Sequence, residues 1–234
     1  MIGHQGPSFR AATIALMARY DAIADWYDQV FRSALSGPEV DVLERLLGPG
    51  PGRCLDLGCG TGVAVPVLSR LGWSVVGVDS SEPLLERARD RGLNVVEAPA
   101  DALPFEDGAF DAVVSIWTHT DVEDFAGAVR EAVRVLAPGG PLVYVGAHPC
   151  FVGPHSRFVQ ARGVPSLLPG YRAAGRYDGG PAISPEGLRA KVGAVHLPLD
   201  GLLHCFLDAG LRIERFEELP GREYPYMLAL RARR

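Results

Sequence analysis

The sequence predicts an α/β protein with an open, doubly wound and mostly parallel β-sheet. Beyond residue 50, short and almost wholly apolar runs alternate with helical patterns. Strands that are apolar throughout belong to a sheet that helices cover on both faces. The chain has 234 residues, of which 47% are hydrophobic and 22% charged, so it is long enough for one sizeable core. Together these observations predict a single Rossmann-like domain.

The alternating elements can be placed in order along the chain. The expected strands are residues 53–58, 74–79, 110–116 and 141–147, with a further short strand just before Asp101. The expected helices are residues 63–71, 83–91 and 122–136. Ser80 or Ser81 ahead of Pro83 favours a capped start for the second helix, and the sequence TDVE at residues 120–123 is typical of a capping box for the third.

The C-terminal part of the sequence predicts one helix and a hairpin. Residues 199–209 have a helical pattern that Gly210 ends, and His204 falls within its apolar stretch, which favours a place in the core. Two strand-like runs follow at residues 211–219 and 224–232. We expect them to form an antiparallel hairpin at the edge of the sheet.

Two segments do not fit the alternation. Residues 1–47 have a helical pattern, and we expect them to form a cap over the carboxyl edge of the sheet. Residues 148–198 follow the fifth strand and are too long for an ordinary connection. We expect this insertion to be a lid that faces the substrate, because such loops usually carry function. Residues 48–147 then form the ligand-binding core, and residues 199–234 complete the same domain.

Composition and charge argue against several classes of protein. The formal net charge is -5 and the sequence has no broad basic region, so nucleic acid is not an expected partner. No apolar run approaches about 18 residues and no signal-peptide pattern opens the chain, which favours a cytoplasmic protein without a membrane partner. The four cysteines lack the spacing of a zinc site or a disulfide framework. The acids that follow His119 are better explained as residues of a helix start, so we expect no metal.

The sequence LDLGCGTG at residues 55–62 joins a predicted strand to a helix through a glycine-rich turn. Such a turn lets a ligand approach backbone N–H groups, since glycine has no Cβ. A phosphate-binding P-loop would end in Lys followed by Ser or Thr, and this turn has neither. A dinucleotide fingerprint would place its third glycine at position 63, which is Val63. The pattern here is G-x-G-x-G, formed by Gly58, Gly60 and Gly62.

Two carboxylates outside the turn narrow the choice of ligand. Asp79 ends the next strand about 20 residues after the first glycine, where a carboxylate can accept from both hydroxyls of a ribose. Asp101 follows the third strand, where a carboxylate could accept from an adenine amino group. The turn and the two acids therefore predict a ligand that contains adenosine.

Several motifs together resemble the class I S-adenosylmethionine-dependent methyltransferases. They are CLDLGCGTG, GVDSSEPLLERAR, ADALPFEDGAFD and VLAPGG, and the resemblance covers residues 20–145. The sequence YDAIADWYD is similar to the small-molecule branch that includes the ubiquinone and menaquinone C-methyltransferases. WTHTDVEDF and YVGAHPCFVGPHS further resemble a bacterial group associated with natural-product pathways.

The resemblance implies S-adenosylmethionine as cofactor and S-adenosylhomocysteine as its product. The glycine turn would then lie against the methionine part, Asp79 against the ribose and Asp101 against the adenine, while Tyr20 would cover the cofactor. Asp56 would lie near the amino group or organise the turn. The residues that the resemblance assigns to the cofactor are Tyr20, Asp56, Gly58, Cys59, Gly60, Asp79, Ser80, Asp101 and Ala102.

Histidines are the candidates for chemistry on the acceptor. Methyl transfer from a sulfonium is an in-line displacement, so an enzyme aligns the reactants, excludes water and, for an acidic acceptor, supplies a base. His119 and His148 each follow a strand at the carboxyl edge, His196 precedes the last helix, and His155 lies in the insertion. We expect the base or orienting group among His119, His148 and His196. Trp117 either lines the ligand pocket or packs in the core, and we count it with the cofactor residues.

The sequence thus predicts methyl transfer to a small molecule, in bacterial secondary metabolism by the resemblance above. Three other interpretations stay open. A cyclase or rearrangement enzyme could use the same cofactor and fold, a non-catalytic module could bind the cofactor to control a partner, and an NAD oxidoreductase is disfavoured by Val63. The methylated atom is left open, as is the choice between a monomer and a homodimer.

Overall fold

The structure of the chain is a computed structural model that describes residues 20–32, 35, 37–157, 164–181, 183–184, 186–220 and 223–234. The expected N-terminal cap therefore lies outside the described residues up to position 19. Its remainder contains the helices α2 (Ala24–Phe31) and α3 (Pro38–Leu46), in agreement with the helical pattern.

A seven-stranded sheet forms the centre of the molecule, in the order β3-β2-β1-β4-β5-β9-β8. Strands β1 to β5 run parallel, while β9 is antiparallel to both β5 and β8. The predicted doubly wound, mostly parallel sheet with an antiparallel C-terminal hairpin is confirmed. The strands are β1 (Arg53–Leu57), β2 (Ser74–Asp79), β3 (Val95–Glu97), β4 (Ala112–Ile116), β5 (Pro141–Ala147), β8 (Arg212–Glu218) and β9 (Met227–Arg233).

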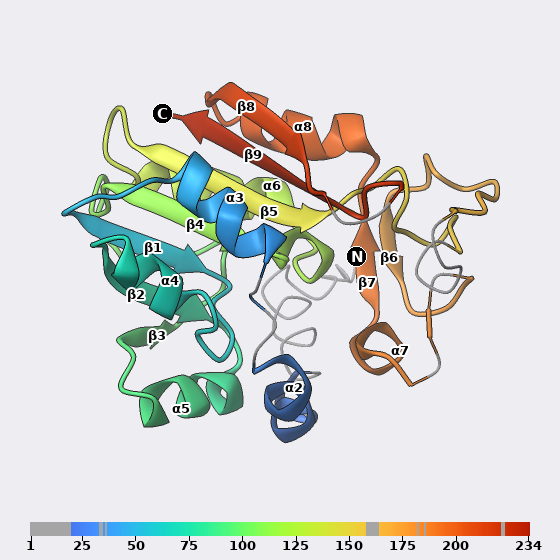
Figure 1. Cartoon of the computed structure of the whole chain (residues 1–234), viewed down its shortest axis with the longest axis horizontal. Helices are drawn as coiled ribbons and strands as arrows, with labels where there is room; N and C mark the ends of the chain where they lie inside the picture. The colour runs from blue at the N-terminus through green and yellow to red at the C-terminus, as the bar shows by residue number, and fades with distance from the viewer. Residues whose placement is uncertain are drawn as a thin grey trace, which may run out of the picture.

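Helices cover both faces of this sheet (Figure 1). On one face, Leu43 of α3 and Leu68 of α4 share an apolar cluster with Val114 of β4. On the other face α6 and α8 pack on the strands. α5 lies against β2 and β3. The helices that join the strands are α4 (Val65–Arg70), α5 (Glu82–Asp90), α6 (Phe125–Val135) and α8 (Leu199–Leu207).

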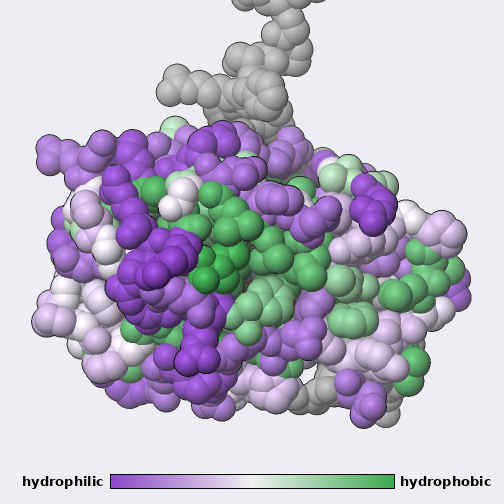
Figure 2. Space-filling model, turned by 90° about the horizontal axis from the view of Figure 1, so that it is seen from above, coloured by the Kyte–Doolittle hydropathy of each residue, from purple (hydrophilic) through white to green (hydrophobic). Residues whose placement is uncertain are grey.

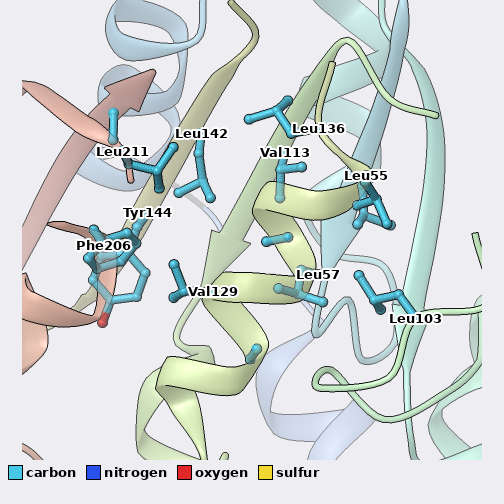
Figure 3. Close-up of a cluster of buried hydrophobic side chains, with 14 of the residues drawn as sticks. Leu55, Leu57, Leu103, Val113, Val129, Leu136, Leu142, Tyr144, Phe206 and Leu211 are labelled. Carbon is cyan, nitrogen blue, oxygen red and sulfur yellow. The ribbon is translucent and has the colours of Figure 1, made fainter. Parts of the chain in front are cut away.

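The alternation of side chains along each strand builds the larger of the two apolar layers (Figure 3). Leu55 of β1 and Val113 of β4 point toward Val129 of α6, and all are buried. Tyr144 of β5 and Phe206 of α8 lie side by side, with ring centroids 5.5 Å apart. Because each large apolar side chain that is fully buried stabilises the fold by about 1.5–3 kcal/mol, this layer holds α6 and α8 firmly on the sheet.

The helix after β4 begins later than the sequence pattern indicates. α6 starts at Phe125, and its N-cap is Asp124, whose Oδ1 accepts a hydrogen bond from the Gly127 N–H at 2.8 Å. The expected capping box at residues 120–123 is therefore wrong. A 3-10 turn, η1 (Thr118–Thr120), follows β4 instead, and it leaves the carboxylate of Asp121 available to other partners.

The insertion after β5 folds into a small unit of its own. Its strands β6 (Gly175–Tyr177) and β7 (Ala194–His196) pair antiparallel, and α7 (Leu188–Val192) precedes β7. Figure 1 shows these elements beyond the carboxyl ends of β4 and β5. Strands of three residues are too short to give a periodic pattern, so the sequence did not predict them. From here on, residues 148–198 are called the insertion.

One face of the molecule carries an apolar patch that hydrophilic side chains border (Figure 2). Large exposed apolar side chains of the described residues include Leu207 of α8 and Phe216 of β8. Within the described ranges, none of the helices combines the length and the apolar character that a membrane span requires.

His204 of α8 is exposed, so its expected place in the core is wrong. Leu202 and Phe206, two positions away on either side, are buried. A separation of two residues turns a helix by about 200°, and His204 therefore lies on the opposite face from both.

Candidate active site

A cleft, here called the main cavity, opens at the carboxyl edge of the sheet, where β1, β2 and β4 end. Its empty space, including the open mouth, is about 880 Å³. The wall is formed by the turns after these strands and by aromatic side chains from residues 20–32, here called the N-terminal helical segment. The lining residues are Tyr20, Tyr27, Gly58, Gly60, Val78, Asp79, Ser80, Leu84, Ala98, Ala100, Asp101, Ile116, Trp117, Thr118, Asp121, Val122 and Glu123.

Most of the residues assigned to the cofactor from sequence come together in this wall. Asp56, Cys59 and Ala102 do not line the main cavity: the first two are buried and Ala102 is exposed. The assigned residues that line it are Tyr20, Gly58, Gly60, Asp79, Ser80, Asp101 and Trp117.

The glycine turn needs glycine for two different reasons. Gly58 has φ 76°, and a Cβ there would lie 2.8 Å from Oγ1 of Thr118, so the turn passes too close to η1 for a side chain. Gly60 has φ 53°, and the nearest atom to a Cβ would be a ring carbon of Tyr27 at 3.9 Å. That is ordinary van der Waals contact, so at Gly60 the positive φ, and not a close approach, favours glycine.

Asp79 fixes this turn to the end of β2. Its Oδ2 accepts from the N–H of Gly60 at 2.9 Å, and its Oδ1 accepts from the N–H groups of Ser80 at 2.8 Å and Ser81 at 3.0 Å. Burial raises the pKa of Asp79, although the three backbone donors act in the opposite direction. One carboxylate thus both organises the turn and presents an acceptor to the main cavity.

Asp56 lies beneath the turn as a buried acid without full hydrogen bonding. Its side chain is 2% exposed, and Oδ2 has no hydrogen-bond partner among the described residues. Burial, and then the nearby charge of Asp79, raise the pKa of Asp56 to about 7.

The charged side chains in the cavity wall are all acidic. They are Asp79, Asp101, Asp121 and Glu123, while no Lys, Arg or His is among the lining residues of the described chain. Carboxylates on several sides of one cleft attract a positively charged ligand and repel phosphate groups. This set of carboxylate acceptors therefore fits a sulfonium or ammonium compound with ribose hydroxyls better than it fits a dinucleotide.

Trp117 has the backbone strain that is typical of functional sites. Its φ is 64°, and it is the only residue other than glycine with positive φ in the described ranges. Its N–H donates to the carbonyl of Val145 at 2.7 Å, and its ring stacks on Tyr226 at 6.5 Å between centroids. Non-glycine residues in this region cost about 1–3 kcal/mol and persist where the surroundings enforce them. These contacts hold the indole in the cavity wall.

His119 is buried behind this wall. Its Nδ1 shares a short hydrogen bond with the hydroxyl of Tyr144, and its ring packs against Phe125. Burial lowers the pKa of His119 to about 3, and the charges of Arg189 and His196 act in the same direction. The imidazole is therefore neutral at neutral pH.

His148 has both ring nitrogens engaged. Nε2 shares a hydrogen bond with Oε1 of Glu218 at 3.0 Å, and Nδ1 accepts from the N–H of Cys150 at 3.3 Å. Burial lowers the pKa of His148, while Glu218 raises it by a smaller amount. His148 therefore connects the start of the insertion to the end of β8.

His196 lies in β7, which packs against η1. Its Nε2 donates to the carbonyl of Tyr171 at 2.7 Å, and burial lowers the pKa of its imidazole. His155 stands beside it, with ring centroids 5.1 Å apart. The three sequence candidates, His119, His148 and His196, all lie outside the wall of the main cavity.

Sequence reasoning missed the partners of Asp121. Its Oδ1 accepts from the hydroxyl of Tyr20 at 2.9 Å, and its carboxylate pairs with Arg189 of α7. The acids after β4 were the available signal, but they resembled a helix cap. The sequence around Arg189 carried no signal for this pairing, because Arg189 lies in a segment without a regular pattern of apolar residues.

Comparisons with known proteins agree with this geometry. Residues 55–144 match a family model described as a methyltransferase domain. The chain is 40% identical over 136 residues to a demethylmenaquinone methyltransferase of Thermus thermophilus. The matched region covers 53% of this chain and 62% of that relative. The chain thus spans well under the full length of that relative.

Solved structures share the fold over most of the chain. An S-adenosylmethionine-dependent methyltransferase from Mesorhizobium loti has a TM-score of 0.70 at 27% identity, covering 85% of this chain and 99% of that chain. The cyclase SpnF has a TM-score of 0.66 at 18% identity, covering 94% of this chain and 95% of that chain. The second similarity concerns the fold alone.

Proposed function

Because the chain carries a class I S-adenosylmethionine-dependent methyltransferase domain, we propose that it transfers a methyl group from this cofactor to a small-molecule acceptor. The observation that carries the proposal is the position of Asp79. Its carboxylate joins the glycine turn to the end of β2 and lines the main cavity. A ribose placed there would find an acceptor, and the backbone of Gly60, which lines the same cavity, would lie beside it.

Different residues of the main cavity bind different parts of the cofactor in this proposal. Gly58 and Gly60 hold the methionine part, Asp79 and Ser80 the ribose, and Asp101 the adenine. The acidic wall attracts a cationic ligand. When bound, S-adenosylmethionine supplies an electrophilic methyl group on a positively charged sulfur. Tyr20 and Tyr27 cover this position from the N-terminal side and exclude water, which favours an in-line displacement.

The insertion forms the acceptor side of the site in this proposal. An acceptor bound in the main cavity beside Thr118 of η1 would lie close to the insertion, since β7 packs directly on η1. The name of the Thermus thermophilus relative, a demethylmenaquinone methyltransferase, supports a small organic acceptor.

The hydrogen bonds of the histidines distinguish their roles. The Tyr144 hydroxyl has no other partner among the described residues, so it donates to Nδ1 of His119 and leaves the imidazole proton on Nε2. His119 is buried outside the wall of the main cavity, so this donor serves the packing behind the wall and does not contact an acceptor bound in the cavity. His196 donates through Nε2, which leaves Nδ1 as an acceptor and makes it the candidate base. His148 has both nitrogens engaged and serves the structure.

Titration calorimetry with S-adenosylmethionine and with S-adenosylhomocysteine tests the cofactor directly. We expect both to bind with one-to-one stoichiometry, and the absence of binding by either would overturn the proposal. Mass spectrometry of reactions with candidate quinols and phenols then tests the transfer. A product heavier by one methyl, with an equal amount of S-adenosylhomocysteine, supports a transferase; an isomer of the substrate, with the cofactor unchanged, supports the cyclase alternative.

A further inference from the structure

Arg189 of α7 reaches from the insertion to the wall of the main cavity. Its guanidinium pairs with Oδ1 of Asp121 and lies 3.3 Å from Oδ2, while Nη2 donates to Oγ1 of Thr120 at 2.7 Å. The side chains of Arg189 and Asp121 are only 24% and 25% exposed. A two-pronged, largely buried contact of this kind is geometrically specific, because the planar guanidinium matches the carboxylate.

The same carboxylate holds the N-terminal side of the cavity. The hydroxyl of Tyr20 donates to Oδ1 of Asp121 at 2.9 Å, and both residues line the main cavity. The ring of Tyr20 stands edge-on to Tyr27 at 5.4 Å between centroids. Asp121 is therefore the point where the insertion and the N-terminal helical segment meet.

A second contact joins the same two segments. Nζ of Lys191 lies 4.8 Å from the centre of the Trp26 ring, a cation–π contact between α7 and α2. Two independent contacts thus connect α7 to the N-terminal helical segment.

Charge explains why Asp121 needs Arg189. Asp121 shares the wall with Asp79, Asp101 and Glu123, so an unpaired carboxylate there would be repelled and poorly solvated. Arg189 is the only basic side chain paired with Asp121 among the described residues. Without it, Asp121 would turn toward solvent, and the hydroxyl of Tyr20 would lose its acceptor.

We propose that Arg189 is a positioning residue that sets the cofactor-binding wall through Asp121 and Tyr20, so that packing of the insertion and binding of the cofactor support each other. The inference rests on the proposed function for the identity of the ligand. Coupling of this kind is reciprocal. A cofactor that contacts Tyr20 stabilises the packed position of α7. Loss of that packing weakens cofactor binding by the same factor.

Binding of S-adenosylhomocysteine to Arg189→Met and Arg189→Lys variants tests the first half of the proposal. We expect the Kd to rise about tenfold for Arg189→Met, since the carboxylate of Asp121 loses its charged partner. The Kd should rise by a smaller factor for Arg189→Lys, which keeps the positive charge but not the planar guanidinium that makes two hydrogen bonds. Arg172→Met is the matched control, because Arg172 is exposed in the same insertion and has no ion pair among the described residues. Its Kd should equal that of the wild type.

A double-mutant cycle with Tyr20→Phe tests whether the effect passes through Asp121. The two single changes should be strongly non-additive in Kd, because each disturbs the same carboxylate. Amide hydrogen exchange supplies the second measurement. S-adenosylhomocysteine should slow exchange in α7 of the wild type, and should slow it to a smaller extent in Tyr20→Phe. In Arg189→Met it should not slow exchange in α7. Tyr20→Phe and Arg189→Lys keep the test decisive if the methionine variant does not fold.

The outcomes separate this inference from the proposed function. If the wild type binds no S-adenosylhomocysteine, the proposed function fails. If the wild type binds it and both Arg189 variants bind it equally well, the positioning role is overturned while the proposed function stands. The same conclusion follows if the change in Kd of the double variant equals the product of the two single changes to within about twofold.

Discussion

The buried carboxyl of Asp56 lies close enough to Asp79 for the charge of one to oppose ionisation of the other. Asp79 has three backbone donors, whereas Oδ2 of Asp56 has no partner among the described residues. The two acids beneath and beside the glycine turn thus differ in environment: Asp79 keeps hydrogen bonds that favour its charge, and the pKa of Asp56 rises to about 7.

This difference predicts a pH dependence of stability that Asp56→Asn should remove. The folded-state pKa of about 7 lies above the value of about 3.9 in an unfolded chain. The native state therefore holds the proton more tightly, and its contribution to stability is full below pH 4 and lost as the pH rises through 7.

Urea unfolding at pH 5.5 and pH 8 measures this contribution. Between these values the stability of the wild type relative to Asp56→Asn should fall by about 2 kcal/mol. Glu86→Gln, which changes an exposed carboxyl, is the control and should follow the wild type at both pH values. A constant difference between wild type and Asp56→Asn would contradict the assigned environment.

His119 predicts the opposite trend on the acid side. Its folded-state pKa of about 3 lies below the value of about 6.5 in an unfolded chain. As the pH falls below about 6.5, the unfolded state binds a proton at this histidine and the native state does not. The contribution of His119 to stability is therefore full above about pH 6.5 and is lost as the pH falls. Relative to His119→Gln, the wild type should lose about 2 kcal/mol between pH 7 and pH 5. His204→Gln, at an exposed site, should show no such difference.

Asp79→Asn should damage cofactor binding out of proportion to its size. One acceptor oxygen becomes an amide group that cannot accept, and three backbone N–H groups then compete for the other. We expect the Kd for S-adenosylhomocysteine to rise at least tenfold and the stability to fall by about 1–3 kcal/mol. Calorimetry and urea unfolding measure the two effects, with the exposed Glu106→Gln as control. An unchanged Kd would remove Asp79 from the ribose site.

Gly146→Ala should destabilise the protein through Tyr144. A Cβ at Gly146 would lie 1.9 Å from the Tyr144 hydroxyl oxygen and 3.0 Å from Nδ1 of His119. Both rings are buried, so neither can move aside. We expect a loss of more than about 2 kcal/mol, or failure to fold. The matched control is Gly179→Ala, because no atom lies within 4 Å of a Cβ there. Equal melting temperatures for the two variants would show that the packing around Tyr144 is loose.

The sequence predicted those parts of the structure that periodic or local chemistry determines. The parallel strands follow from apolar runs such as SVVGVD, and the hairpin from two adjacent strand-like runs. The glycine turn and Asp79 could be placed because strand, turn and helix are neighbours in the chain.

Contacts between distant segments could not be predicted in this way. Asp121 pairs with Arg189, and Tyr20 bonds to Asp121 across 101 positions of sequence. No periodicity encodes such a meeting, and the residues after β4 resembled a helix cap. Ala102 shows a related limit: it is adjacent to Asp101 in sequence, but it is exposed and does not line the main cavity.

Strand β9 has a consequence for how the molecule is made. Met227–Arg233 lies inside the sheet, between β5 and β8, and Pro141 of β5 pairs with Arg233. During synthesis, β5 therefore emerges with one side unpaired and stays so until about 90 further residues have followed at about 5–20 residues per second. An open strand edge invites pairing with other chains. The edge of β5 should thus stay open to other chains for several seconds during synthesis, until β9 pairs with it.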